Sequence, residues 1–207
     1  MVTKQYEVQP LFAEPVFRLD ISDAISAEQV EYVKNLKMVR NQVNLISENL
    51  YLFNDPIMAT IKEAVQGAVN VFADEIMGIS QELYITQSWS LVNNPGVGMH
   101  GHSHSNSIVS GSLYFTDLPE PNSRMIFDRH RVYQQLQMTP MADKRNHYNT
   151  PANFIEPRAG EVVLFSSSLQ HYVESNNSAL DRYSIAFNTF VKGTLGEYRD
   201  VSELVIK

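Results

Sequence analysis

The chain has 207 residues, of which 43% are hydrophobic, and a formal net charge of −7. This length suits one domain with a sizeable core, and the acidity argues against a nucleic-acid partner. The absence of cysteine excludes disulfides, thiolate nucleophiles and cysteine-ligated metal centres. Because the sequence shows neither a signal-peptide pattern nor a run of about 18 apolar residues, we expect a cytoplasmic protein without a membrane span.

The N-terminal part is predicted to combine an edge strand with two helices. Residues 6–21 read as short extended segments that two prolines interrupt, which places them at the edge of a sheet. Ser26 with Gln29 three residues later has the pattern of a capping box and starts a first helix. A second helix is expected over residues 55–77, where apolar residues recur at helical spacing on one face.

From residue 82 onward the pattern changes to short β-type runs separated by turn residues. Several strands at this spacing fit a sandwich or a small barrel. Trp89, in the first run, is interpreted as a core residue. Residues 133–156 are polar and aperiodic, so we expect an exposed loop of the kind that often carries function. The runs are ELYITQSWSLV, IVSGSLYFTDL, RMIFD, GEVVLF, HYVES and DRYSIAFNTFV.

Half of the six histidines of the chain lie within five residues, at His100, His102 and His104. Imidazole is a ligand for iron, zinc, copper and nickel. In an extended chain, alternate residues point the same way, so all three could face one side, although a metal usually takes only two ligands from such a run. A solvated, histidine-rich turn is an equally good interpretation of this segment when it is considered alone.

Two features farther along the chain favour a metal site. His171 follows a glycine-led strand, and Arg182 follows His171 by eleven residues. Arg182 and Ser184 lie two apart on a strand and therefore share a face, which Asn188 shares as well. A guanidinium can hold a carboxylate through two parallel hydrogen bonds and a serine can add a third, so this pair suits a dicarboxylate.

For Arg182 considered alone, a simpler interpretation is an ordinary surface ion pair with Asp181 or Glu174. The order of the features argues for the site instead. A His-x-His pair, a long gap, a glycine-led strand, a further histidine and an Arg-x-Ser pair rarely occur in this order by chance.

These features resemble the 2-oxoglutarate/Fe(II)-dependent dioxygenases, and more closely a small prolyl-hydroxylase-like group from marine bacteria and their phages. The resemblance implies a mainly β, α+β architecture, a double-stranded β-helix of the jelly-roll, cupin-like type with N-terminal helices. It implies one domain over residues 1–207, with a strand and supporting helices in 1–80 and the jelly-roll core in 82–195. The segments that carry it are Ser88-Trp89, His102-x-His104, Ser110 to Tyr114, Gly160 to Phe165, His171, and Arg182 to Asn188.

The resemblance also implies an Fe(II) site with 2-oxoglutarate as co-substrate. The implied metal ligands are His102, His104 and His171, or His100 in a shifted register. The implied catalytic residues are these three histidines and Arg182. The implied 2-oxoglutarate-binding residues are Arg182, Ser184, Tyr114 and Asn188. One departure matters, because the wider superfamily has a carboxylate two residues after its first histidine, where this chain has a second histidine.

The implied reaction couples decarboxylation of 2-oxoglutarate to hydroxylation of a C–H bond in a small-molecule or peptidyl substrate. Two rival interpretations stay open. One is a three-histidine metal-binding cupin without 2-oxoglutarate chemistry, and the other is a jelly-roll protein that is not an enzyme. Whether the chain forms a homodimer stays open as well.

Overall fold

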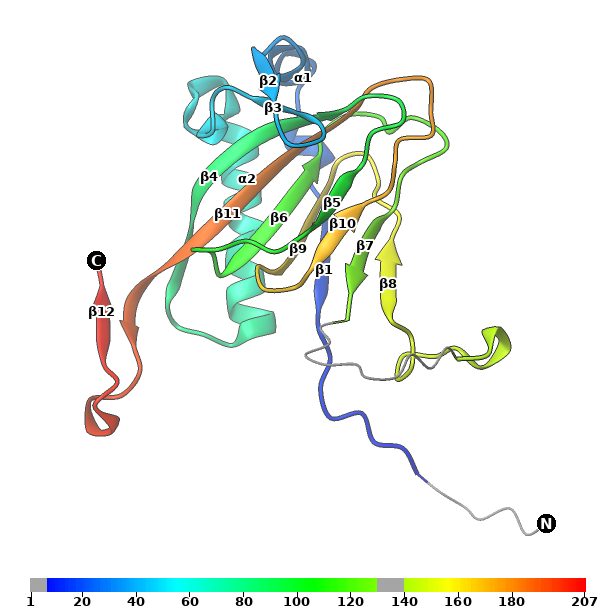
Figure 1. Cartoon of the computed structure of the whole chain (residues 1–207). Helices are drawn as coiled ribbons and strands as arrows, with labels where there is room; N and C mark the ends of the chain where they lie inside the picture. Colours follow the sequence, from blue (N-terminus) through cyan, green and yellow to red (C-terminus); the bar gives the residue numbers. More distant parts are fainter. Residues whose placement is uncertain (1–6, 130–139) are drawn as a thin grey trace, which may run out of the picture.

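The computed structural model describes residues 7–129 and 140–207. Its strands form two antiparallel sheets that face each other in a jelly roll (Figure 1), so the predicted fold class is confirmed. The larger sheet runs in the order β1 (Val16–Asp20), β9 (Glu161–Ser166), β6 (Val109–Tyr114), β11 (Arg182–Leu195), β4 (Glu82–Asn93), β3 (Leu45–Ser47) and β2 (Met38–Arg40), and β12 (Leu204–Ile206) pairs with β11. The smaller sheet runs in the order β5 (Met99–His102), β10 (His171–Val173), β7 (Met125–Asp128) and β8 (Ala152–Ile155).

The first helix, α1 (Ala27–Lys34), begins at the predicted capping box. The Ser26 side chain accepts a hydrogen bond from the Gln29 N–H, and the Gln29 side chain accepts one from the Ser26 N–H. These two bonds satisfy backbone donors that the first helical turn leaves without partners. Within the described residues, none of the helices has the length and apolar character needed to cross a bilayer.

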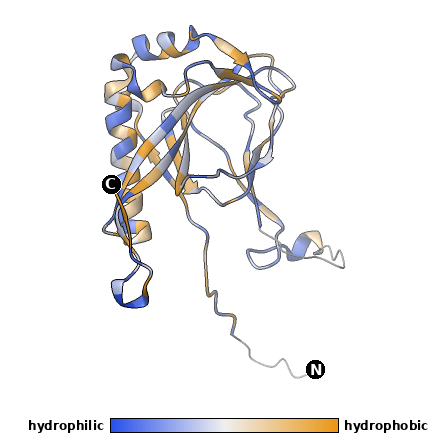
Figure 2. Cartoon of the chain, turned by 60° about the vertical axis from the view of Figure 1, so that its left-hand side comes forward, coloured by the Kyte–Doolittle hydropathy of each residue, from blue (hydrophilic) through white to orange (hydrophobic). Residues whose placement is uncertain are grey.

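The second helix forms where the apolar spacing predicts it. It consists of α2 (Ala59–Val71) and a π-helical continuation (Phe72–Met77). Gly78 ends it in the left-handed region, at a φ of 62°, which glycine adopts without steric cost. The helix lies along one face of the larger sheet, as Figures 1 and 2 show from two directions.

Strand β11 presents different residues to its two faces. Ile185 and Phe187 are fully buried in the hydrophobic cluster that α2 covers. Arg182 alternates with them, and its guanidinium lies over the Tyr114 ring in the space between the two sheets. The interior of the jelly roll therefore lies on the Arg182 side of β11. A second cluster fills part of it and consists of Tyr114, Met125, Phe127, Val163 and Phe165.

Three short strands are among the parts of the fold that differ from the sequence prediction. The sequence predicts one strand for residues 1–80, whereas β2 and β3 add a hairpin to the larger sheet beside β4. The predicted loop over residues 133–156 contains strand β8, which pairs with β7. Each of these strands has three or four residues, too few for a periodic signal. Strands β3 and β8 pair with strands distant in the chain, whereas β2 pairs with its neighbour β3. Of the predicted loop, residues 133–139 lie outside the described part of the chain.

Candidate metal centre

The structure brings together three of the histidines. His102 on β5 pairs directly with His171 on β10 across the smaller sheet. His104 follows β5, and its backbone N–H donates to the Ser167 carbonyl at 2.9 Å. One ring nitrogen from each of the three histidines lies within 4.8 Å of the others. That spacing suits one metal ion with bonds of about 2 Å to each nitrogen.

Backbone carbonyls set the tautomers of two of these rings. His171 Nδ1 lies 2.9 Å from the Leu169 carbonyl oxygen, and His102 Nδ1 lies 2.8 Å from the His100 carbonyl oxygen. A carbonyl can only accept, so each Nδ1 carries the proton and each Nε2 presents its lone pair. An orienting bond on the second ring nitrogen is typical of histidines that bind metals.

Two of the histidines are held in the neutral, metal-binding form. Burial lowers the pKa of His104 to about 4, with a further contribution from the charge of His102. Burial also lowers the pKa of His171 to about 3, although the hydrogen bond to the Leu169 carbonyl opposes this shift. Both imidazoles are therefore uncharged at neutral pH, and protons do not compete there for their lone pairs.

His100 is placed differently from these three. Its side chain is exposed, and it does not belong to the cluster. It contributes its backbone carbonyl, which accepts from the His102 ring. The geometry therefore favours the register of His102 and His104 over the one that begins at His100.

No carboxylate accompanies the three imidazoles. Within the described residues, the candidate metal-binding cluster contains histidine alone. The remaining residues, 1–6 and 130–139, have the sequences MVTKQY and HRVYQQLQMT, which contain neither aspartate nor glutamate. The candidate ligands at this centre are therefore imidazoles alone, unlike the two-histidine, one-carboxylate set of non-haem iron oxygenases.

Arg182 is a buried cation in the interior of the jelly roll. The residue is 2% exposed, and its Nε and Nη2 have no hydrogen-bond partner among the described residues. The two acids that would make it an ordinary ion pair are engaged elsewhere. Glu174 pairs with Arg124, and Asp181 accepts from Asn94 at 2.8 Å. The surface ion-pair interpretation of Arg182 is therefore wrong.

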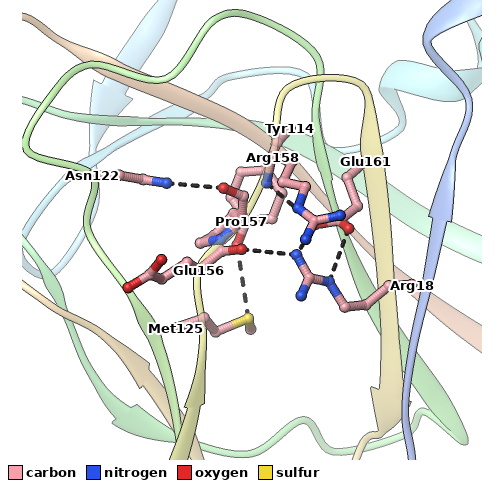
Figure 3. A network of polar contacts seen from close by, with 8 residues as sticks. All are labelled: Arg18, Tyr114, Asn122, Met125, Glu156, Pro157, Arg158 and Glu161. Carbon is pink, nitrogen blue, oxygen red and sulfur yellow. Dashed lines mark hydrogen bonds and ion pairs between the residues drawn. The ribbon is translucent and has the colours of Figure 1, made fainter.

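A third acid near this interior, Glu161, is also engaged (Figure 3). It lies opposite Tyr114 across strands β6 and β9. Both of its carboxylate oxygens accept from Arg18 at 2.8 Å, and Oε2 also accepts from the Arg158 backbone N–H at 3.2 Å. Arg18 thus neutralises Glu161, and the positive charge of Arg182 stays without a compensating carboxylate in the described part of the chain.

Two hydroxyl groups lie on the same inner face as Arg182. The Tyr114 hydroxyl donates to Met125 Sδ at 3.7 Å, and a thioether sulfur is a weak acceptor. Ser184, 6% exposed, is two residues from Arg182 on β11. An oxygen-rich anion next to Arg182 would offer both hydroxyls better acceptors than they have in the protein.

Asn188 shares the inner face but lies far from Arg182. Six residues of strand separate them, which corresponds to about 20 Å. Asn188 Oδ1 accepts from Ser110 Oγ at 2.8 Å, and Ser110 is opposite Phe165, whose ring centroid lies 4.6 Å from that of His171. Asn188 therefore lies at the histidine end of the interior and cannot bind the same carboxylate as Arg182.

Trp89, which the sequence suggested as a core residue, lies beside the candidate metal centre. Its ring is only partly buried and lies 6.4 Å, centroid to centroid, from the His104 ring. It pairs with Ala186, which shares the Arg182 face of β11. The sequence held one signal for this placement. Side chains alternate along β4, so Trp89 faces away from its neighbours Ser88 and Ser90, which are buried on the opposite face of the sheet.

Comparison with known proteins agrees with this geometry. Residues 87–188, which include the histidine cluster and Arg182, match the model of a family described as "Putative 2OG-Fe(II) oxygenase". No curated protein matches the chain.

Several solved structures share the fold at low sequence identity. An oxidoreductase of the 2OG-Fe(II) oxygenase family from Burkholderia pseudomallei is 14% identical, with a TM-score of 0.57 over 84% of this chain and 83% of its own. A prolyl-4-hydroxylase from Pseudomonas putida is 16% identical, with a TM-score of 0.58 over 87% and 94%. HygX from Streptomyces hygroscopicus, with nickel and 2-oxoglutarate bound, is 12% identical, with a TM-score of 0.58 over 85% and 82%. The segment that holds the candidate site thus matches the 2OG-Fe(II) oxygenase family, and the chain has the fold of that superfamily.

Proposed function

We propose that this protein is an oxygenase that uses Fe(II) and 2-oxoglutarate to hydroxylate a C–H bond of a small-molecule or peptidyl substrate. The observation that carries the proposal is the buried guanidinium of Arg182, which lies in the same interior as a three-histidine cluster and whose Nε and Nη2 have no partner among the described residues. A buried charge without a partner costs several kcal/mol, so an anionic ligand is the simplest reason for a protein to keep one. The family match and the 2-oxoglutarate bound in the HygX structure support this ligand.

The residues present fit both groups. His102, His104 and His171 would hold the iron through neutral imidazole nitrogens, and Arg182 would bind the C5 carboxylate of 2-oxoglutarate through Nε and Nη2. When bound, iron and 2-oxoglutarate supply the oxidising chemistry, in which dioxygen converts 2-oxoglutarate to succinate and carbon dioxide and hydroxylates the substrate.

The chain itself contributes binding, orientation and exclusion of water. Arg182 fixes one end of the co-substrate, and Ser184 and the Tyr114 hydroxyl add donors to the same carboxylate. Phe127 and Phe165 pack edge to face, 5.3 Å apart, and form an apolar wall beside His171. Such a wall keeps bulk water from the histidine cluster and strengthens the electrostatic contacts within it.

We also propose that residues 1–207 act as a single domain. The helix of residues 59–71 has no core of its own, because its buried side chains pack on the larger sheet. A jelly roll without this helix would expose that face of the sheet, so the two parts are expected to unfold together.

The three candidate histidine ligands also support a second candidate function, a three-histidine metal protein without 2-oxoglutarate chemistry. Three neutral ligands leave a bound divalent ion with one more positive charge than a set that includes a carboxylate. Such a centre does not itself require an arginine for a dicarboxylate. The burial of Arg182 without a partner for Nε and Nη2 in the described part of the chain is therefore the observation that ranks the oxygenase first.

The test is the release of succinate from 2-oxoglutarate by protein loaded with Fe(II) without oxygen and then exposed to air. We expect iron-dependent succinate even without the natural substrate, and loss of 2-oxoglutarate binding in Arg182→Met with metal retained. Arg124→Met is the matched control, because this arginine already has a carboxylate partner. Iron-loaded protein that neither binds nor decarboxylates 2-oxoglutarate would favour the second candidate.

A further inference from the structure

Strand β12 (Leu204–Ile206) is an edge strand at the margin of the molecule (Figure 1). It pairs with the end of β11 through three residue pairs, with Val205 opposite Thr194 at the centre. No other described strand pairs with β12, so its outer edge is open. An open edge presents backbone donors and acceptors to any strand that can align with it.

Two hydrogen bonds on β11 show which backbone groups of β12 point outward. In an antiparallel ladder, the N–H and C=O of one residue point to the same side, and neighbouring residues alternate. The Thr194 carbonyl accepts from the Gln81 side chain at 2.7 Å, and Gln81 immediately precedes β4. The Thr189 carbonyl, five residues earlier, accepts from Ile108 at 3.1 Å on the β6 side, as the alternation requires.

Thr194 therefore directs its backbone toward the β4 side, away from β12. Val205, which lies opposite Thr194, directs its own N–H and C=O away from β11 by the same rule. By the same alternation, the backbone groups of Leu204 and Ile206 point toward β11, and those of Glu203 and Lys207 point outward. The open edge thus offers the backbone groups of residues 203, 205 and 207.

Apolar side chains accompany this open backbone. Leu204 is 56% exposed and Val205 is 57% exposed, although both lie in a strand of the described sheet. Charged residues flank them, with Glu203 on one side and Lys207 on the other. Natural proteins protect open edges with proline, bulges, charged side chains or very short strands. Strand β12 is short and has charged flanks, but residues 203–207 contain no proline, so the backbone of this edge can still pair.

We propose that β12 is the interface of a homodimer, in which it pairs antiparallel with β12 of a second copy about a two-fold axis at Val205. In this register Val205 faces Val205 of the partner subunit and exchanges both backbone hydrogen bonds with it. Leu204 faces the partner subunit's Ile206, and Glu203 faces the partner subunit's Lys207. Two-fold symmetry repeats the apolar pair and the ion pair, so both ends of the strand are matched.

The charge pattern of residues 203–207, Glu-Leu-Val-Ile-Lys, favours pairing with a second copy of the same strand over pairing with an unrelated strand. When two copies of the segment pair antiparallel, Glu203 of one copy lies opposite Lys207 of the other, and the apolar residues 204–206 lie opposite each other. A parallel, in-register arrangement would instead place Glu203 against Glu203 of the partner subunit, which repels. The segment is thus complementary to itself in the antiparallel orientation alone.

The test compares the molar mass of the whole protein with that of charge variants, by sedimentation over a range of concentrations. We expect wild-type protein to approach twice the chain mass as its concentration rises. Glu203→Lys and Lys207→Glu should each weaken self-association by about tenfold, since two cross-strand pairs per dimer change from attraction to repulsion. An equimolar mixture of the two variants should restore dimers, because each then meets the opposite charge.

A proline variant tests the backbone contribution. Val205→Pro removes an outward N–H and no bond to β11, so it should abolish dimers and leave the fold unchanged by circular dichroism. Ile206→Pro is the contrasting variant, because it removes an N–H that bonds to β11 and should loosen the hairpin itself. A wild-type protein that stays monomeric at all concentrations overturns the proposal, and so do dimers that persist in Val205→Pro or are indifferent to the charge changes.

Discussion

The guanidinium of Arg182 lies over the ring of Tyr114, with 5.0 Å between its Cζ and the ring centroid. The ring face stabilises the cation from one side, while Nε and Nη2 have no partner among the described residues. The Tyr114 hydroxyl meanwhile donates to a sulfur, the weak acceptor of Met125. This pair therefore forms a preorganised set of donors, and its remaining hydrogen-bonding capacity points to an anion.

Arg182→Met should make the ligand-free protein more stable. The change removes a buried charge whose Nε and Nη2 have no partner in the described part of the chain, and it keeps a side chain of similar length against the Tyr114 ring. An unsatisfied buried donor costs about 1–3 kcal/mol, so we expect a gain of that order in the free energy of unfolding, measured in urea. Addition of 2-oxoglutarate should stabilise wild-type protein and leave this variant unchanged.

The Arg124→Met control should behave in the opposite way. Arg124 is partly exposed and bonded to Glu174, so its loss should cost at most about 1 kcal/mol and leave the response to 2-oxoglutarate intact. A loss of stability in Arg182→Met as large as that of a core deletion would mean that the arginine has a structural role.

Metal binding should quench the fluorescence of Trp89, the single tryptophan of the chain. Its ring lies 6.4 Å from that of His104, so an open-shell ion such as Co²⁺ or Cu²⁺ at the histidine cluster would lie within quenching range. Titration should give a saturable signal with one ion per chain in wild-type protein. His171→Ala should weaken the response strongly, whereas His100→Ala should leave it unchanged, and equal effects of the two variants would contradict the proposed ligand set.

Replacement of one imidazole by a carboxylate should change the metal preference. Imidazole ligands favour nickel, copper and zinc, whereas carboxylates are suited to manganese. We therefore expect His104→Asp or His104→Glu to bind Mn²⁺ more tightly relative to Ni²⁺ than wild-type protein does. Calorimetric titration of each ion gives the ratio of dissociation constants, and an unchanged ratio in a folded, metal-binding variant would show that His104 is not a ligand.

The metal-free protein should lose stability as the pH falls from about 6.5 toward about 4. His104 and His171 have folded-state pKa values of about 4 and about 3, below the value of 6.5 expected in the unfolded chain. In this window the unfolded state binds more protons than the folded state, so the free energy of unfolding rises with pH. Each histidine contributes up to about 1.4 kcal/mol per pH unit, and the contribution is complete above pH 6.5.

Urea unfolding of chelator-treated protein between pH 4.5 and 7.5 measures this slope. His171→Asn, which does not titrate, should flatten it by roughly half. Glu174 does not confound the result, because its hydrogen bonds with Arg124 lower the pKa of its carboxyl below an ordinary value of 4.5, under the window. A slope that is the same in wild-type protein and in His171→Asn would mean that this histidine is not buried in the neutral form.

Local patterns in the sequence were sufficient for most of the fold. Alternation over short runs indicated the long strands, and a capping box and helical spacing indicated the helices, because backbone geometry imposes these periods on residues that are neighbours in the chain. The short strands were not predictable in this way. Residues 38–40, 45–47 and 152–155 become strands through hydrogen bonds to partners that no local pattern reveals.

The candidate site, like the fold, was predictable from the sequence only in part. The sequence by itself determined the residue types, namely histidines without a nearby carboxylate and an Arg-x-Ser pair on one face of a strand. Only the tertiary structure decided that His104 lies beside His171 and His100 does not, that Arg182 is buried with no partner for Nε and Nη2 among the described residues, and that Asn188 is at the opposite end of the interior. Each of these outcomes depends on pairing between segments far apart in the chain. The packing of the two sheets against each other determines which side chains are buried. Burial in turn determines their charge states and their hydrogen-bond partners.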